Sequence, residues 1–342
     1  MHIKSYAKIN LALDAGEPMP NGMHPVDMVM QQISLHDDVT ISVRAEGEAK
    51  GGETTNAEGA QMQGGETTNA IAIGNGFSIW LRTNSEIIPV DEGNIAFRAA
   101  ESMVQKYMGI FPERAAADDK KRVCIFIEKR IPVAAGLAGG SGNAAAVIHA
   151  LNAIWELGLS LDELCDIGKK LGSDVPFCIT GQARANFLLP NEIKGDRRAA
   201  TCARARGTGT ELQPINPPLN AHIIIAKPNI GVSTAEVYKG IDSCDIKKRP
   251  DIDLVEKEII RGMVSRAAVE MVNVLENYTL NAYPEVKELK AFMQENMEGA
   301  EHVLMSGSGP SVFAIFTDEL AAIKAFQQLG EVDCESFLCR TI

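Results

Sequence analysis

The chain has 342 residues, a formal net charge of −12 and a hydrophobic fraction of 45%. At about 100–200 residues per domain, this length predicts two domains, and the apolar fraction is sufficient for real cores. The acidic balance argues against nucleic acid as a partner, and no apolar run is long enough to cross a bilayer, so we expect no membrane partner either.

The start of the chain and its cysteines indicate a reducing compartment. Residues 1–6 contain no signal-peptide core, so we expect the protein to stay in the cytoplasm. The seven cysteines include no Cys-x-x-Cys pair, which favours reduced thiols over a disulfide framework or a zinc site. We expect no metal site built from protein side chains alone, and a monomer or weak homodimer.

The first predicted element is a strand that includes residues 6–11. Alternation places Lys8 and Asn10 on one face, and the opposite face carries Ala7, Ile9, Leu11 and Leu13. A lysine in such a strand is usually an edge residue that reaches solvent, since lysine is seldom buried. The alternative is a buried cation with a chemical role.

A repeated polar segment follows this strand region. The heptapeptide from Gly51 to Ala57 recurs unchanged from Gly64 to Ala70, and it can bury little apolar surface. We therefore interpret residues of about 46–76 as an insertion that forms a mobile loop. The family resemblance given below implies a second insertion at about 184–202, between two strands, and we expect residues 196–198 to form a solvated turn.

The segment 131–146 is rich in glycine. It follows a predicted strand that includes residues 123–127 and ends at Pro132, and it precedes a predicted helix that starts near Ala144 and is closed by Gly158. Such a loop lets bare N–H groups converge on an anion at a helix N-terminus. Glycines suit it because side chains would block that approach and some positions require φ > 0. The segment lacks both the Walker and the dinucleotide spacing. It predicts a phosphate site; the alternative is a Gly-rich turn without a ligand.

Asp174 follows a well-marked helix. Ser160 and Glu163 form a predicted capping box for a helix over 161–171, with Gly172 as its C′ residue. Pro176 biases the residue before it toward an extended conformation, so we expect Asp174 on a loop with little freedom. The alternative is a turn aspartate that bonds its own backbone.

The C-terminal half has the pattern of a compact α+β unit. Residues 222–226 and 312–316 predict buried strands, and apolar spacing predicts helices near 286–293 and 320–329. Residues 305–311 predict a strand end followed by a second turn of glycine and serine.

The Gly-rich segment resembles the ATP loop of the GHMP kinases, a family of small-molecule kinases. Further segments are similar to the family members that act on a cytidine diphosphate methylerythritol in non-mevalonate isoprenoid synthesis: residues 7–11, 21–24, 172–177, 231–238, 273–277 and 305–311. The resemblance implies an α+β, two-domain GHMP kinase fold. It implies an N-terminal ATP-binding domain over 1–215, similar to ribosomal protein S5 domain 2, and a ferredoxin-like C-terminal domain over 216–342.

The resemblance also implies a reaction: ATP, with Mg²⁺, phosphorylates the 2-hydroxyl of the substrate. Asp174 matches the catalytic base and Lys8 matches the lysine beside the acceptor hydroxyl. The expected ATP-binding residues are those of the loop: Pro132, Val133, Ala134, Ala135, Gly136, Leu137, Ala138, Gly139, Gly140, Ser141, Gly142 and Asn143.

At the substrate end, His24 matches the histidine that recognises cytosine, and Asn10 is a further expected polar contact. The sequence departs from the family pattern twice, with Met23 where tyrosine is usual and Gly142 where serine is usual. These departures leave two alternatives open: a GHMP kinase for another small alcohol, or a non-catalytic nucleotide-binding paralogue. Retention of Lys8 and Asp174 argues against the second.

Overall fold

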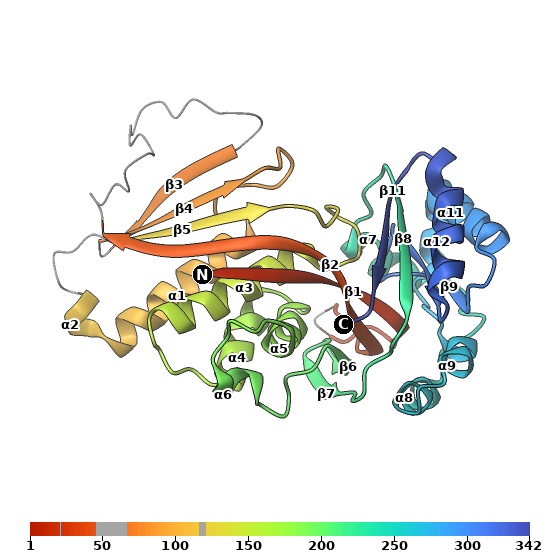
Figure 1. The fold of residues 1–342 in the computed structure, drawn as a ribbon, viewed down its shortest axis with the longest axis horizontal. Helices are drawn as coiled ribbons and strands as arrows, with labels where there is room; N and C mark the ends of the chain where they lie inside the picture. The colour runs from red at the N-terminus through yellow and green to blue at the C-terminus, as the bar shows by residue number, and fades with distance from the viewer. Residues whose placement is uncertain (21, 46–66, 75, 116–120) are drawn as a thin grey trace.

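The computed structural model describes residues 1–20, 22–45, 67–74, 76–115 and 121–342, and within them the strands form two sheets, each with its own helices (Figure 1). The sheets stand side by side along the long axis of the molecule. The first sheet contains β1 (His2–Ala15), β2 (Val26–Ala45), β3 (Thr67–Gly74), β4 (Phe77–Thr83), β5 (Lys121–Glu128), β6 (Cys202–Gly207) and β7 (Glu211–Pro214).

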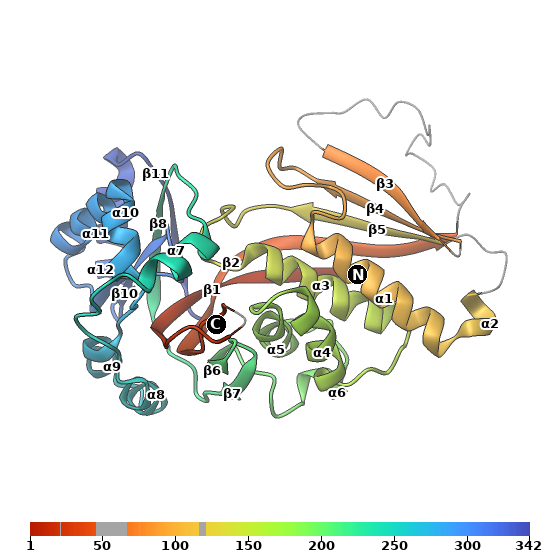
Figure 2. The ribbon, with the colours of Figure 1, turned by 180° about the vertical axis from the view of Figure 1, so that it is seen from behind.

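The first sheet has the order β3-β4-β5-β2-β6-β7, with β1 paired to the other edge of β2. Its pairs are antiparallel except β4 with β5. One face is covered by helices, as Figure 2 shows, and the largest core cluster lies between these helices and the sheet. The helices of this half are α1 (Ile95–Ile110), α2 (Pro112–Ala115), α3 (Gly139–Ile154), α4 (Leu161–Leu171), α5 (Val175–Ala185) and α6 (Asn191–Lys194).

The second sheet is antiparallel and has the order β11-β8-β10-β9. Its strands are β8 (His222–Pro228), β9 (His302–Met305), β10 (Val312–Phe316) and β11 (Cys334–Arg340). Helices connect β8 to β9 and β10 to β11, which is the βαββαβ arrangement of a ferredoxin-like unit. The helices are α7 (Thr234–Ile241), α8 (Ile252–Ile260), α9 (Val264–Glu270), α10 (Glu276–Ala282), α11 (Pro284–Asn296) and α12 (Glu319–Gln327), which continues as a 3₁₀ turn over Gln328–Glu331.

The apolar runs of the second sheet are explained by burial on both faces. In β8, Ile223 and Ile225 belong to one core cluster, whereas Ile224 and Ala226 belong to another. A strand covered on both sides has no polar face, so its residues are apolar without alternation. The strands predicted at 222–226 and 312–316 and the helices near 286–293 and 320–329 are confirmed.

The two halves share their cores. Two of the three clusters of buried residues combine side chains from both sheets, so the halves pack against each other through apolar contacts. Between β7, which ends at Pro214, and β8, which begins at His222, the chain crosses from one sheet to the other. We propose this crossing as the boundary between the domains 1–215 and 216–342.

Strand β1 departs from simple alternation. Its register with β2 shifts between Tyr6 and Lys8 and again between Asn10 and Ala12. As a result Ala12 joins the cluster that holds Ile9 and Leu11, whereas Leu13 joins the other cluster, so the predicted face of Leu13 is wrong. A β-bulge inserts one extra residue, and this reverses the face of every side chain beyond it.

Several predicted element ends also differ. The helix predicted near Ala144 begins at Gly139, and it ends at Ile154, well before Gly158. Two residues beyond that end have positive φ, Glu156 at 52° and the predicted Gly158 at 67°. Gly172 has an extended φ of 174°, so it is not a left-handed C′ residue. The capping box of Ser160 and Glu163 is confirmed, with both of its hydrogen bonds present.

The two predicted insertions differ from the observed structure in different ways. Residues 46–66 and 75 of the first insertion lie outside the described residues, but Thr67–Gly74 form β3, so that part is not a loop. The second insertion joins helix α5 to strand β6 rather than two strands, and it contains the short helix α6. Its turn is not simply solvated, because Arg198 forms ion pairs with Asp162 and Asp196.

All seven cysteines are free thiols in the structure. Within the described part of the chain, no helix is both long enough and apolar enough to span a membrane.

His149 gives the fold a measurable pH dependence. Its side chain on α3 is buried, Nε2 lies 2.9 Å from Ile179 O of α5, and burial lowers the His149 pKa to about 4. Below about pH 6.5 the His149 imidazole binds a proton in the unfolded chain, whereas in the folded chain it binds one only below about pH 4. We therefore expect the free energy of unfolding to decrease as the pH is lowered from about 6.5 to about 4, by up to about 1.4 kcal/mol per pH unit from this residue.

Urea unfolding at pH 5 and pH 7 measures this effect. The His149→Gln variant should lose less of its free energy of unfolding between the two pH values than the unmodified protein does. Equal losses would assign the acid sensitivity to other groups.

Candidate active site

A cleft of about 1110 Å³ lies where the two halves meet. One side is formed by β1, the Gly-rich loop and the start of α5, and the other by α7 and the turn between β9 and β10. All but one of the residues predicted for the site line it: Lys8, Asn10, His24, Pro132, Val133, Ala134, Ala135, Gly136, Leu137, Ala138, Gly139, Gly140, Ser141, Asn143 and Asp174. The exception is Gly142.

Lys8, Asn10 and Asp174 form the polar centre of the cleft. The Lys8 side chain is only 5% exposed, so it is the buried cation of the two alternatives and not an edge residue. Its Nζ donates to Asn10 Oδ1 at 2.6 Å and lies 3.5 Å from Asp174 Oδ2. Asp174 is 29% exposed, so its carboxylate still reaches the open cleft. An ammonium is thereby held beside a carboxylate that a ligand can approach.

Asp174 owes its position to the start of α5. It is the N-cap residue of this helix, but its side chain makes no capping hydrogen bond. Val175 is helical rather than extended as predicted, because proline is tolerated in the first turn, where its missing N–H has no partner in any case. The Asp174 carboxylate is thus fixed by the backbone while its oxygens stay available, and it does not bond its own backbone.

The Gly-rich loop is tied to both halves. Lys8 N donates to Leu137 O at 3.0 Å, which joins the loop to β1. From the other half, Ser306 Oγ donates to Gly136 O at 3.0 Å. The turn that carries Ser306 is held in turn by Asn273, whose Nδ2 donates to Met305 O and Gly307 O. The predicted second turn therefore faces the loop across the cleft.

The glycines of the loop serve two separate purposes. Gly136 has φ +71°, as predicted for some of them, but Gly139 and Gly140 belong to the first turn of α3. Positive φ is instead taken by two alanines, Ala134 and Ala138. At Gly139 the reason for glycine is space, since an added Cβ would lie 3.0 Å from Lys129 Nζ.

Gly142 does not line the cleft, and its backbone groups form hydrogen bonds within the protein. Its N–H donates to Ala138 O within α3, and its carbonyl accepts a hydrogen bond from Gln182 Nε2 at 2.7 Å. A Cβ at this position would lie 2.5 Å from the buried Ser5 Oγ. The residue therefore has no free group for a phosphate, and the absent serine hydroxyl is excluded by Ser5.

This geometry predicts a compensated pair. Gly142→Ser should lower the free energy of unfolding by about 1–3 kcal/mol, because it overpacks the core against Ser5. Adding Ser5→Ala should restore most of that loss, while Ser5→Ala alone should change little, because Ser5 Oγ has no hydrogen-bond partner to lose. Urea unfolding of the four proteins measures the coupling, and additive effects would contradict the steric explanation.

His24 lies at the other end of the cleft with both ring nitrogens turned toward protein atoms. Nδ1 is 2.9 Å from Gly16 O, and because a carbonyl only accepts, Nδ1 carries a proton. Nε2 is 3.5 Å from Asp242 Oδ1. The ring packs against Tyr238 with centroids 5.5 Å apart. In this arrangement both ring nitrogens face protein atoms and the side chain is only 3% exposed.

Sequence reasoning missed several lining residues. Lys129 lies just before the predicted loop, and Thr234 and Tyr238 belong to a segment that resembles the family but received no role. Burial raises the pKa of Tyr238, and Asp174 adds to the effect, so its phenol stays neutral. The cleft is lined by three lysines, Lys8, Lys129 and Lys239, and by two aspartates, Asp174 and Asp242.

Family models match both halves of the chain. The model described as the N-terminal domain of GHMP kinases matches residues 94–182, and the model described as their C-terminal domain matches residues 248–332. The first match spans the Gly-rich loop and Asp174, and the second spans the turn that faces the loop.

Curated relatives match nearly the whole chain. A 4-diphosphocytidyl-2-C-methyl-D-erythritol kinase of Alkaliphilus metalliredigens is 39% identical over 331 residues, with 96% of this chain and 92% of that protein covered. The enzyme of the same name from Clostridioides difficile is 38% identical, with 96% and 91% covered. Among solved structures, a 4-(cytidine 5'-diphospho)-2C-methyl-D-erythritol kinase matches with a TM-score of 0.69 and 24% identity, covering 100% of this chain and 99% of that one. A mevalonate kinase shares the fold, with a TM-score of 0.57, 13% identity and coverage of 100% and 99%.

Proposed function

From its membership of the GHMP kinases, and within them of the 4-diphosphocytidyl-2-C-methyl-D-erythritol kinases, we propose that this chain phosphorylates the 2-hydroxyl of 4-diphosphocytidyl-2-C-methyl-D-erythritol with ATP. It is a small-molecule kinase that uses ATP as co-substrate. The observation that carries the proposed mechanism is the Lys8–Asp174 pair, which lies in the cleft beside the Gly-rich loop. The reaction belongs to the non-mevalonate route to isoprenoid precursors.

Asp174 acts as the catalytic base in this proposal. Its carboxylate accepts, or orients, the proton of the substrate hydroxyl as that oxygen attacks the γ-phosphorus of ATP. Lys8 is held by Asn10 and keeps the hydroxyl and Asp174 in line, and its charge offsets the negative charge of the group in transfer. Because the transition state of phosphoryl transfer is loose, the positions of these groups matter more than full deprotonation.

The loop and the first turn of α3 hold the ATP phosphates. The N-terminus of α3 presents unpaired N–H groups and the positive end of the helix dipole to the cleft. Phosphate is favoured there because no acidic side chain lies in the loop between Pro132 and Asn143.

Mg²⁺ enters with the nucleotide in this proposal. In the part of the chain that the structure describes, no group of three or more His, Cys, Asp or Glu side chains is arranged to hold a metal. Two oxygens of α3 would hold the ion beside the nucleotide phosphates. These are the hydroxyl of Ser141 and the buried Asn143 Oδ1, which has no hydrogen-bond partner. Both are hard oxygen donors of the kind that Mg²⁺ prefers, and the ion would neutralise phosphate charge.

The cytosine base occupies the end of the cleft beside His24, Met23 and Tyr238. His24 and Tyr238 supply the planar rings among the lining residues, and a planar base gains most by packing on such surfaces. Met23 is 45% exposed and can cover the base with its flexible, polarisable side chain in place of tyrosine.

We propose that the enzyme works in the cytoplasm as a monomer or weak homodimer, without a nucleic acid or membrane partner. The free state of its seven cysteines fits a reducing compartment. Its net charge of −12 disfavours association with nucleic acid.

A coupled assay of ADP release tests the proposed function. With ATP and Mg²⁺, the purified protein should turn over 4-diphosphocytidyl-2-C-methyl-D-erythritol but neither homoserine nor mevalonate. Turnover of another small alcohol instead would identify a different GHMP kinase. Binding of MgADP without turnover of any alcohol in the panel would indicate a non-catalytic paralogue.

A further inference from the structure

We propose that Asp37 is a positioning residue of the nucleotide site: it fixes the chain that leads into the Gly-rich loop and holds the Lys129 ammonium at the nucleotide end of the cleft. This inference rests on the proposed function, because it assumes that the loop binds ATP. Asp37 lies on β2, outside the cleft lining, and none of the motifs that indicate a kinase contains it.

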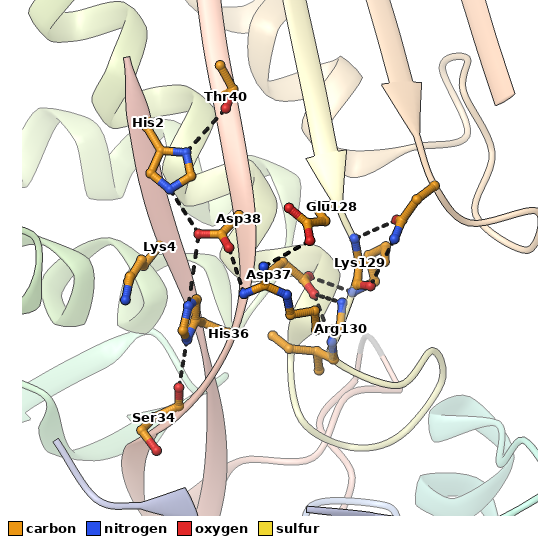
Figure 3. A network of polar contacts seen from close by, with 12 residues as sticks. His2, Lys4, Ser34, His36, Asp37, Asp38, Thr40, Glu128, Lys129 and Arg130 are labelled. Carbon is orange, nitrogen blue, oxygen red and sulfur yellow. Dashed lines mark hydrogen bonds and ion pairs between the residues drawn. The ribbon is translucent and has the colours of Figure 1, made fainter. Parts of the chain in front are cut away.

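The Asp37 carboxylate is completely buried and its two oxygens have different partners (Figure 3). Oδ1 accepts hydrogen bonds from the backbone N–H groups of Arg130 and Ile131, each at 2.8 Å. Oδ2 accepts one from Lys129 Nζ at 2.5 Å. One side chain of β2 thus holds three consecutive residues that follow β5.

These three residues lead directly into the loop. Strand β5 ends at Glu128, and Pro132 is the first residue of the proposed phosphate-binding segment. The Lys129 backbone is held as well, since its N–H donates to Asn84 Oδ1 at 2.7 Å. A buried carboxylate is tolerated only when it is paired and hydrogen-bonded, so Asp37 and its donors depend on one another. The start of the loop is therefore fixed relative to the sheet.

Lys129 connects this buried contact with the cleft. Its side chain is 8% exposed, yet the residue lines the cleft. The ideal position of a Cβ on Gly139 is 3.0 Å from Lys129 Nζ, which places the ammonium at the first residue of α3. Anions are already favoured at that helix end, and a partly desolvated ammonium adds to the attraction. Asp37 keeps this cation from turning elsewhere.

Because Oδ1 binds backbone N–H groups and Oδ2 binds the Lys129 ammonium, substitutions can separate the effect of the backbone contacts from that of the ammonium. Asp37→Asn can keep an oxygen for the two backbone N–H groups while it places an NH₂ group against the Lys129 ammonium. Lys129→Met removes the ammonium and leaves the backbone contacts. Asp38→Asn is the matched control: Asp38 is the next residue of β2, and it binds Arg130 Nη1 at 2.7 Å and His2 Nε2 at 2.9 Å instead of Lys129 (Figure 3).

Titration calorimetry with MgADP, together with steady-state kinetics, tests the proposal. Lys129→Met and Asp37→Asn should each weaken MgADP binding at least tenfold, as expected for loss of a charged contact. The double variant should bind no more weakly than the worse single variant, because both changes remove one interaction. The KM for the cytidyl substrate should stay within about twofold, and Asp38→Asn should leave the Kd for MgADP within about twofold.

Unchanged MgADP affinity in either Asp37→Asn or Lys129→Met would overturn the proposal, whatever the melting temperature of the variant. Additive losses in the double variant would overturn it too, because Asp37 would then act independently of Lys129. If Asp37→Asn does not fold, Asp37→Glu replaces it, with the same weakening expected because its longer arm displaces the ammonium. If the variants show the expected pattern of MgADP affinities but the wild-type protein has no turnover, the proposed function is contradicted and this inference is not.

Discussion

Replacing Asp174 by asparagine is expected to lower kcat by about 10²–10⁴-fold, the usual contribution of a general base. Asparagine keeps the size of the side chain but cannot accept the hydroxyl proton. The α5 N-terminus should persist, because the Asp174 side chain makes no capping hydrogen bond. Lys8 also keeps its hydrogen bond to Asn10. The KM for ATP and the Kd for MgADP should therefore remain within about twofold of wild type.

The measurement is the coupled ADP-release assay with both substrates saturating, run beside calorimetric titration with MgADP. Asp318→Asn is a suitable control, since Asp318 also precedes a helix, but it caps α12 and lies outside the cleft lining. Its turnover should equal that of the wild type. Turnover of Asp174→Asn within tenfold of wild type would remove Asp174 from the role of base.

Replacing Gly136 by alanine should separate the loop from the opposite turn. An alanine Cβ would lie 2.3 Å from Ser306 O and 3.0 Å from Gly309 O, and both obstacles are backbone atoms. The φ of +71° adds the cost of a left-handed residue. Because a displacement of about 1 Å in a positioned site can cost about 100-fold, we expect kcat/KM for ATP to fall at least 100-fold.

The Gly262→Ala variant separates the cost of a positive φ from the cost of the steric clash with the opposite turn. Gly262 has a similar φ of +69°, but nothing lies within 4 Å of its ideal Cβ position. This variant should lose roughly 1 kcal/mol of unfolding free energy and keep its activity. Chemical unfolding and kinetics of both variants provide the comparison. If Gly136→Ala behaved like Gly262→Ala, the loop would not depend on its close contact with Ser306.

Local patterns in the sequence were sufficient for much of the fold. The capping box at Ser160 and Glu163 acts within four residues, so its prediction needed no knowledge of the rest of the chain. The runs of β8 and β10 predicted buried strands because full burial leaves no polar face. The strand, loop and helix around Gly136 could also be found locally, since each element is defined by its own spacing.

Details of backbone geometry were less accessible. The bulges of β1 that reverse the face of Leu13 depend on its pairing with β2, which alternation along one strand does not reveal. Positive φ at Ala134 and Ala138 is imposed by the path between β5 and α3, although glycine would be the expected residue.

The sequence was sufficient to identify the residue types of the site, but not to predict which of these residues contact one another. Lys8 approaches Asp174, Ser306 approaches Gly136, and Asp37 holds the residues that precede the loop, each across a long interval of chain. Capping, periodicity and turn preferences act over a few residues, so they identify elements and the chemistry each can carry. Contacts between distant residues depend on how sheets and helices bury their apolar faces together, and that packing of the whole chain selected which polar groups share the cleft.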